Sequence, residues 1–297
     1  MTGVTAPSGV ARRLLVASRP LSWVNTAFPF AAAYVLTVGA VNVTLVIGTI
    51  FFLVPYNLAM YGINDVFDYE SDAANPRKGG AEGALLDRSL HGTTIAAAAV
   101  LCVPFVIALI ALGDPLSWLV LAVSLFAVVA YSVPGLRFKE VPFLDSVTSS
   151  IHFVSPAVYA LVLAGAVFTP RLAMLLIAFF LWGVASHAFG AVQDVEPDRV
   201  GGIASIATVM GAAWTVRFAL GCWVAAGVLM LTTQWPGPLG AVLVVPYILL
   251  AAPYAAIADA DAAEAHRGWR RFLVANYVCG FLTTILLICY ALEGSRP

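Results

Sequence analysis

Long apolar runs, separated by short polar stretches, dominate the chain. Nine of these runs are long enough to cross a membrane as a helix, which takes about 20 residues. The predicted spans are residues 21–41, 43–63, 93–113, 116–134, 142–166, 171–192, 212–232, 238–258 and 271–292. A membrane barrel would show short alternating segments instead of such runs. The pattern therefore predicts an all-α membrane protein with nine transmembrane helices.

The composition supports a membrane protein and excludes several other classes. Hydrophobic residues make up 61% and charged residues 10% of the 297 residues, against roughly 45–50% and 25% in soluble domains. So few charges cannot cover a soluble surface, which excludes a soluble enzyme, a disordered chain and a nucleic-acid binder. We expect one polytopic domain over residues 1–297, with the lipid bilayer as its surroundings.

The basic residues predict the orientation of the chain. Twelve of the fifteen lie before the first span or in every second loop, and such an excess marks the cytoplasmic side. The N-terminus and these loops are therefore expected in the cytoplasm, and the C-terminus outside. An odd number of spans, such as nine, is required by this arrangement.

A cluster of acids follows the second predicted span. If the helix continues, Asp65, Asp68 and Asp72 share one face, and Asn64 lies nearly on the same face. Like charges at this spacing repel, and the membrane interior excludes them. Since Mg²⁺ takes oxygen ligands and commonly joins carboxylates to substrate phosphates, a magnesium site is the simplest reason for this cluster.

The sixth predicted span ends in the same way. Asp194 and Asp198 form a second pair, four residues apart, at another cytoplasmic helix end. One such pair would be read as a solvated helix terminus, but two in a chain with sixteen acids predict a metal site.

Basic side chains are predicted on the same side of the membrane as both clusters. Arg77 and Lys78 follow the first cluster, and Arg137 and Lys139 follow the fourth span. Each alone reads as an anchor at the cytoplasmic face, but beside the acids they suggest an anion site. Acids for a metal and bases for an anion, at the mouth of an apolar bundle, indicate a metal–diphosphate site.

These motifs resemble those of the UbiA superfamily of intramembrane prenyltransferases. The likeness rests on Asn64-Asp65-x-x-Asp68-x-x-x-Asp72 and Asp194-x-x-x-Asp198. It extends to Arg19-Pro20, to the loop from Tyr131 to Lys139, and to residues 202–208. It implies nine helices around a central cavity.

Within that superfamily the chain is similar to the lycopene elongases of C50 carotenoid synthesis. The similar stretches are residues 75–83 and 187–199. Quinone-type members tend to carry an Arg-Thr-x-x-Arg-Pro run after the first motif, and often an acid where His187 stands here. These differences fit an acceptor without an acidic hydroxyl, such as a polyene.

The resemblance implies Mg²⁺-dependent transfer from an allylic diphosphate, dimethylallyl diphosphate, to the ends of lycopene, giving C45 and C50 carotenoids. The metal ligands would be Asp65, Asp68, Asp72, Asp194 and Asp198. Asn64, Arg19, Arg77, Lys78, Arg137 and Lys139 would bind the donor. His187 could remove the final proton, and Tyr131 could bind phosphate or shield the cation. Other carotenoid enzymes, such as a cyclase, are expected partners.

Two alternatives stay open at the level of the sequence. The first keeps the chemistry but uses an aromatic or quinone precursor, such as a menaquinone-like acceptor. The second is a cation-coupled transporter that uses the acids as ion ligands. Transporter acids usually lie near the middle of the bilayer, whereas these stand at span ends.

Overall fold

The computed structural model describes residues 7–74 and 86–294, and all regular structure in this part is helical. Within these residues, eight helical segments are long and apolar enough to cross a membrane. The number is nine if residues 9–22 and 24–38, which are bent by 59°, form one span. The predicted all-α membrane fold is therefore confirmed, and the protein is a multi-pass membrane protein.

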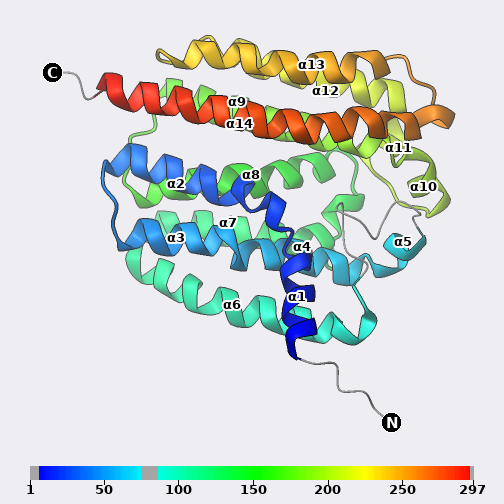
Figure 1. Cartoon of the computed structure of the whole chain (residues 1–297), viewed down its shortest axis with the longest axis horizontal. Helices are drawn as coiled ribbons and strands as arrows, with labels where there is room; N and C mark the ends of the chain where they lie inside the picture. The colour runs from blue at the N-terminus through cyan, green and yellow to red at the C-terminus, as the bar shows by residue number, and fades with distance from the viewer. Residues whose placement is uncertain (1–6, 75–85, 295–297) are drawn as a thin grey trace. The chain divides into compact units, whose positions relative to one another are not determined.

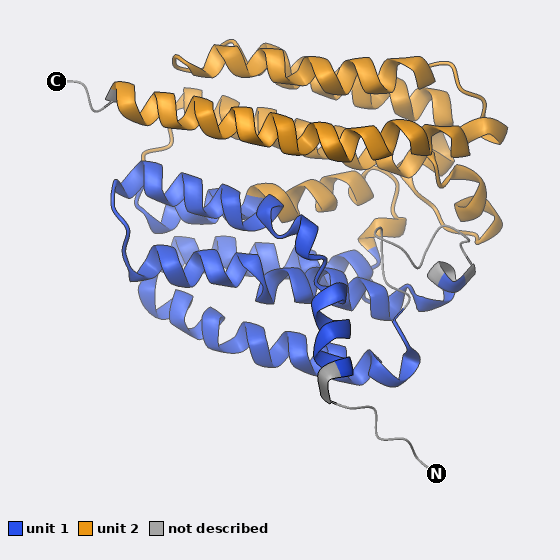
Figure 2. Ribbon diagram, viewed as in Figure 1, with its two compact units in different colours: residues 1–137, 155–166 blue, residues 138–154, 167–297 orange. Residues whose placement is uncertain are grey.

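The chain divides into two compact units (Figure 2). Unit 1 contains residues 1–137 and 155–166, and unit 2 contains residues 138–154 and 167–297. The α-helices of unit 1 are α1 (Pro7–Ala17), α2 (Val24–Val38), α3 (Val43–Leu53), α4 (Pro55–Phe67), α5 (Tyr69–Ala74), α6 (His91–Leu112), α7 (Pro115–Ser132) and the second part of α8 (Leu144–Leu163). Within this unit, α2 packs against α3, and α4 packs against α6 and α7 (Figure 1).

Helix ends in unit 1 follow from local side chains. The Asn42 side chain accepts from the backbone N–H of Leu45 and caps α3, and Asp114 forms a capping box at the start of α7. Gly39, with φ of 71°, ends α2. These caps place the turns between spans where the hydrophobic pattern predicts them.

The break between α3 and α4 is held by buried polar groups. Pro55 begins α4, and the Phe52 carbonyl accepts hydrogen bonds from Thr26 at 2.7 Å and from Asn57 at 2.8 Å. Such bonds satisfy backbone groups that a proline break frees within a membrane. Around them lies an aromatic core in which the rings of Phe51 and Phe52 are 4.9 Å apart.

The first α-helix of unit 2 is the first part of α8, which follows the 3-10 turn Phe138–Glu140. The other α-helices of unit 2 are α9 (Pro170–Val192), α10 (Val195–Val200), α11 (Ile206–Met210), α12 (Ala212–Met230), α13 (Val245–Ala251) and α14 (His266–Gly294). Within this unit, α12 packs against α9, and α13 packs against α12 and α14 (Figure 1). The core contains stacked rings of Trp223, Tyr247 and Phe272.

The eighth predicted span is less regular than the sequence pattern suggests. It consists of a 3-10 segment, Gly237–Val244, followed by the seven residues of α13 and a second 3-10 turn, Ala252–Tyr254. Pro246 and Pro253 stand at the starts of the last two pieces. Since proline lacks a backbone N–H, it tends to begin a new helical piece here instead of continuing the previous one.

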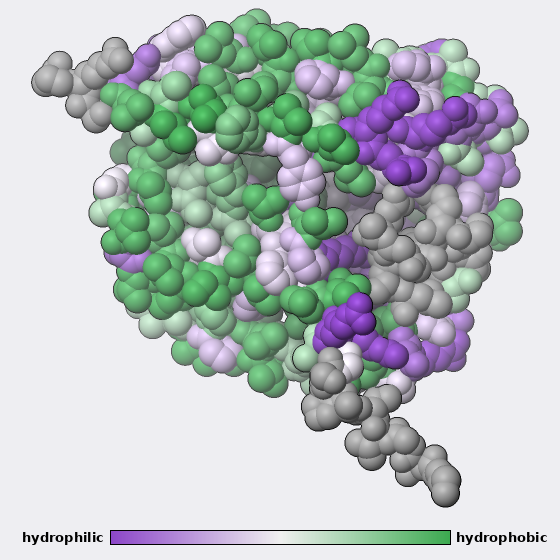
Figure 3. All heavy atoms as spheres, viewed as in Figure 1, coloured by the Kyte–Doolittle hydropathy of each residue, from purple (hydrophilic) through white to green (hydrophobic). Residues whose placement is uncertain are grey.

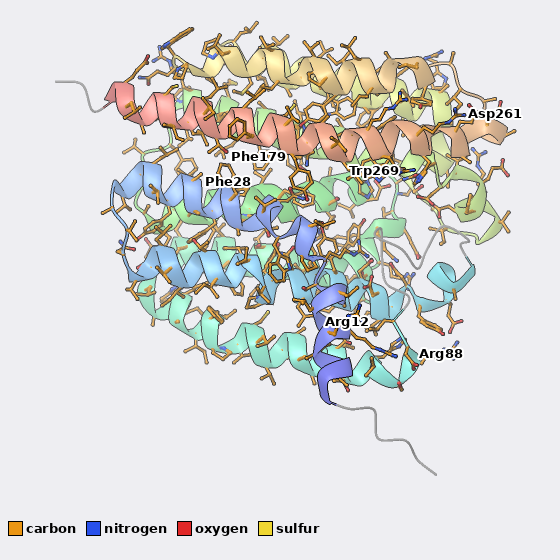
Figure 4. The ribbon with its side chains drawn as sticks, in the orientation of Figure 1. Arg12, Phe28, Arg88, Phe179, Asp261 and Trp269 are labelled. Carbon is orange, nitrogen blue, oxygen red and sulfur yellow. The ribbon has the colours of Figure 1, made fainter. Side chains whose placement is uncertain are left out.

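Many of the exposed side chains are large and apolar, as expected for a membrane protein. Apolar side chains cover most of the face seen in Figure 3. Val100 on α6 is 70% exposed and Phe281 on α14 is 65% exposed. The labelled basic residues Arg12 and Arg88 lie near the end of unit 1 where α4 ends and α6 begins (Figure 4).

Candidate active site

The two acid motifs have the same local structure. Helix α4 ends at Phe67, Asp68 follows with φ of −99° and ψ of 0°, and the six-residue helix α5 comes next. Asp194, beyond the end of α9, has φ of −100° and ψ of 2° and precedes the six-residue helix α10. Asp72 and Asp198 are each the fourth residue of the short helix.

The expectation of one helix running through the first motif is therefore wrong. Asp68 adopts the sparsely populated bridge conformation, which often occurs at active sites. No glycine or proline marks the position, so the sequence gives no local signal for the break. Each motif is an Asp-x-x-x-Asp unit in which the first acid stands at a turn.

Asp68 lies among polar side chains of unit 1. The Asn64 side chain donates to an Asp68 oxygen at 2.6 Å and to Ser132 on α7 at 3.0 Å. The Arg137 guanidinium lies 3.9 Å from the other Asp68 oxygen. The expectation that Asn64 and Asp68 share one face is confirmed, and the loop after α7 contributes a cation beside them.

Asp65 has different surroundings. Its buried carboxylate accepts a hydrogen bond from Arg19 at 2.8 Å, and that guanidinium also lies over the ring of Tyr61, 4.4 Å from its centroid. In the second motif the matching position is Ala191. Asp65 is thus outside the repeated Asp-x-x-x-Asp unit, and its described partner is a cation of the chain itself.

Two arginines at the first motif have unusual backbone conformations. Arg19 has φ of 51° and Arg137 has φ of 42°, in the left-handed region that residues other than glycine seldom adopt. Such conformations cost about 1–3 kcal/mol each and cluster at functional sites. The fold therefore accepts strain at the two residues that bring cations to Asp65 and Asp68.

The second motif has its own basic neighbour. Asp194 and Asp198 are half-buried, and Lys139 lies in a 3-10 turn, Phe138–Glu140, of the same unit. The pKa of Lys139 is lowered to about 8, because the effect of burial outweighs the opposite effect of the nearby Glu140 and Asp198 carboxylates. An ammonium group in this setting favours a nearby anion.

His187 lies in α9, two turns before Asp194. Its Nδ1 atom is 3.0 Å from the hydroxyl of Ser146 in α8. Asp145, next to Ser146, is fully buried, and its oxygens accept from the backbone N–H groups of Ser146 and Ile206. The hydrophobic pattern does not single out Asp145, because this residue lies inside a predicted span, although an acid there is itself a sign of function.

Several predicted residues have little or no described structure. Arg77 and Lys78 lie outside the described residues, as does the side chain of Asp72. Tyr131 is half-buried in the last turn of α7. Their roles stay predictions.

The donor atoms suit magnesium. Among the described residues, no group of three or more His, Cys, Asp or Glu side chains is close enough together to bind a metal ion without further ligands. Mg²⁺ does not need such a group, because it is usually held by one or two carboxylates together with waters and substrate phosphates. The hard oxygen atoms of an Asp-x-x-x-Asp pair, with cations at hand for a phosphate, fit that mode of binding.

Comparison with known proteins shows the family of the chain. The UbiA prenyltransferase family matches residues 26–291. The C(50) beta-cyclic carotenoids biosynthesis protein LbtBC of Dietzia sp. (strain CQ4) is 56% identical over 97% of this chain and 67% of its own length. A lycopene elongase/hydratase of Corynebacterium glutamicum is 48% identical over 93% of this chain and 96% of its own.

A solved structure has the same fold. The UbiA homolog of Archaeoglobus fulgidus, bound to DMAPP and Mg²⁺, matches with a TM-score of 0.64 at 15% identity, over 90% of this chain and 98% of its own. Because the family model covers residues 26–291, the chain belongs to the UbiA prenyltransferase family, and with the curated relatives above this makes it an enzyme that transfers prenyl groups. The similarity to lycopene elongases within that family is also confirmed.

Proposed function

We propose that this protein transfers a dimethylallyl group from dimethylallyl diphosphate to the ends of lycopene, with Mg²⁺, and so forms C45 and C50 carotenoids. The observation that carries the proposal is the 48% identity, over nearly the full length of both chains, to a relative that bears the name lycopene elongase/hydratase. The donor and the metal are supported by a family member with DMAPP and Mg²⁺ bound.

The proposed metal ligands are the acids of the repeated unit. Asp68 and Asp72 of the first motif, with Asp194 and Asp198 of the second, would hold Mg²⁺ for the donor diphosphate. When bound, the metal supplies positive charge that holds the diphosphate and stabilises it as a leaving group. Asn64 orients Asp68 through their 2.6 Å hydrogen bond.

The basic side chains neutralise the charge that grows on the diphosphate as the C–O bond breaks. Arg137, beside Asp68, and Lys139, in the same unit as Asp198, are proposed for this role. Arg77 and Lys78 are proposed as well. Groups held in place before the reaction stabilise such charge without reorganisation, and each tenfold gain in rate takes about 1.4 kcal/mol.

Arg19 would act at the edge of this site. Its guanidinium pairs with Asp65 and lies over the ring of Tyr61. We propose that these two contacts keep Arg19 in the position from which it contacts the donor. Tyr131 would shield the allylic cation with its ring.

The acceptor double bond then attacks the allylic cation, which leaves a tertiary cation on the carotenoid. His187 is proposed as the base that removes a proton from it. Apolar helices around the cation limit its capture by water. A second round at the other end takes the product from C45 to C50.

The active-site loops are proposed to face the cytoplasm, with the N-terminus, and the C-terminus to lie outside. The placement of twelve basic residues in the N-terminus and in alternate loops supports this orientation. A cyclase that receives the product is a proposed partner.

Expression in a lycopene-accumulating bacterium tests the proposal. We expect C45 and C50 carotenoids by mass spectrometry from the wild type, and none from Asp68→Ala or Asp194→Ala at equal membrane levels. Unchanged lycopene with a well-inserted wild type would contradict the carotenoid acceptor. A prenylated quinone precursor in the same cells would then indicate an aromatic acceptor.

A further inference from the structure

A buried carboxylate in unit 2 has no role in the proposed binding of metal or diphosphate. Asp145 is in the first turn of α8 and is 0% exposed. Its oxygens accept from the N–H of Ser146 at 2.6 Å and of Ile206 at 2.7 Å. Within the described residues, no arginine or lysine pairs with it.

Such a carboxylate favours a positive charge beside it. Burying an ionised carboxylate is costly, and two neutral N–H groups offset only part of that cost. A group that gains a proton next to Asp145 would be stabilised by the negative charge. His187 is such a group, because its Nδ1 lies 3.0 Å from the hydroxyl of Ser146, the residue after Asp145.

The packing of α8 on α9 fixes this arrangement. Gly183 in α9 lies so close to Ser150 in α8 that an added Cβ would be 2.3 Å from its Oγ. Ser150 donates to the Phe180 carbonyl at 2.7 Å. Ser146 precedes Ser150 by one turn and His187 follows Gly183 by one turn, so the close approach sets the register of the Ser146–His187 contact.

We propose that Asp145 and Ser146 are positioning residues that prepare His187 to take the proton from the elongated carotenoid cation. This inference rests on the proposed function and deepens it. In the tautomer with its proton on Nδ1, this N–H donates to the Ser146 hydroxyl and the lone pair of the ring is on Nε2, the atom proposed to take the proton. Asp145 then stabilises the imidazolium that forms, as the buried aspartate does in a catalytic triad.

The step balances in atoms and charge. A C–H bond next to the tertiary cation breaks, its electron pair becomes a C=C bond, and the proton moves to Nε2 of His187. The positive charge passes from the carotenoid to the ring, beside the Asp145 carboxylate. The ring later returns the proton to water. When this base is impaired, the cation lives longer and more of it captures water.

The test uses the purified full chain in liposomes with dimethylallyl diphosphate, lycopene and Mg²⁺. The rates and the ratio of hydroxylated to alkene end groups are measured. We expect His187→Gln to lower kcat about 100-fold, and Asp145→Asn and Ser146→Ala about tenfold. The KM for the donor should stay within about twofold, and the hydroxylated share should rise in all three. In the His187→Gln background, Asp145→Asn should slow the enzyme no further.

Two variants control for the structural role of Asp145 as a helix cap. Asp259 accepts from the N–H of Ala212 at 2.7 Å, at the start of α12, much as Asp145 accepts at the start of α11. Ser205 forms the capping box of α11. We expect Asp259→Asn and Ser205→Ala to leave both kcat and the product ratio unchanged.

Three results would overturn the inference while leaving the proposed function in place. In the first, Asp145→Asn and Ser146→Ala leave kcat and the product ratio unchanged, like the two controls. In the second, these variants change only the KM for the donor. In the third, Asp145→Asn lowers kcat further in the His187→Gln background. If Asp145→Asn does not fold, Ser146→Ala decides, because it keeps the carboxylate on Ile206. A wild type that forms no C45 or C50 carotenoid would overturn the proposed function, and this inference with it.

Discussion

At the scale of single residues, neighbouring acids of one motif have different surroundings. Asp65 is held by Arg19, whereas Asp68 stands at a turn, bonded to Asn64 and close to Arg137. Asp68 and Asp194 share one backbone conformation, and Asp65 has no acidic counterpart in the second motif. The proposed metal ligands Asp68 and Asp194 therefore differ from Asp65, which pairs with Arg19, in their local backbone structure and not in residue type.

This difference predicts separate effects of substituting the two acids. Asp68→Asn should raise the Mg²⁺ concentration for half-maximal activity by about tenfold or more, because it removes a proposed ligand. Asp65→Asn and Arg19→Gln should each reduce activity without changing that concentration. Since the two share one ion pair, the double variant should be little worse than either single one. The measurement is a Mg²⁺ titration of prenyl transfer in liposomes.

A shift in the Mg²⁺ requirement of Asp65→Asn as large as that of Asp68→Asn would contradict this assignment. It would place Asp65 among the metal ligands, as the sequence pattern first suggested. Arg19→Gln is the matched control, because it disturbs the same pair without touching a carboxylate.

At the scale of elements, small residues set how closely helices approach. Gly183 allows α9 to approach α8 at Ser150, whereas Gly280 in α14 has no atom within 4 Å of an added Cβ. Both glycines are inside helices, where alanine is intrinsically preferred by about 1 kcal/mol. Their surroundings, not their helix propensity, should therefore decide the outcome of substitution.

Gly183→Ala should destabilise the protein and Gly280→Ala should not. The first forces a Cβ against Ser150, and overpacking of this kind typically costs about 1–3 kcal/mol. Thermal unfolding in detergent should show a lower midpoint for Gly183→Ala and an unchanged or higher one for Gly280→Ala. Equal midpoints for the two variants would mean that α8 and α9 are not in tight contact at this point.

The sequence predicts the elements well and the details of the motifs less well. The apolar runs and the acids at two span ends predict the helices and both Asp-x-x-x-Asp units. The turn at Asp68 is not predicted, because its neighbours are compatible with a helix. The left-handed arginines and the link from Asp145 through Ser146 to His187 depend on contacts between residues far apart in the chain, which periodicity does not encode.

At the scale of the whole molecule, the charge distribution along the chain predicts its orientation. Arg199 and Arg267 fall in loops expected in the cytoplasm, and the C-terminus, after α14, is predicted to lie on the opposite side. Positive charge near span ends sets topology, and an odd number of spans places the two termini on opposite sides. The proposed diphosphate site would then face the cytoplasm.

Reporter fusions test this orientation. Alkaline phosphatase, which is active only outside the cytoplasm, should be active when fused after residue 297. It should be inactive when fused after Glu140, in the loop that follows α7. Green fluorescent protein at the same two positions should give the opposite pattern. Phosphatase activity at Glu140 together with fluorescence at the C-terminus would reverse the topology.

We propose that the chain transfers a dimethylallyl group to lycopene, and isotope labelling follows this transfer directly. Purified protein in liposomes is given lycopene, Mg²⁺ and isotope-labelled dimethylallyl diphosphate, and the carotenoids are analysed by mass spectrometry. We predict one labelled group in a C45 product and two in a C50 product, both absent with a chelator or with Asp194→Ala. Label found only in hydrolysed donor, or in an added quinone precursor in place of the carotenoid, would contradict the claim.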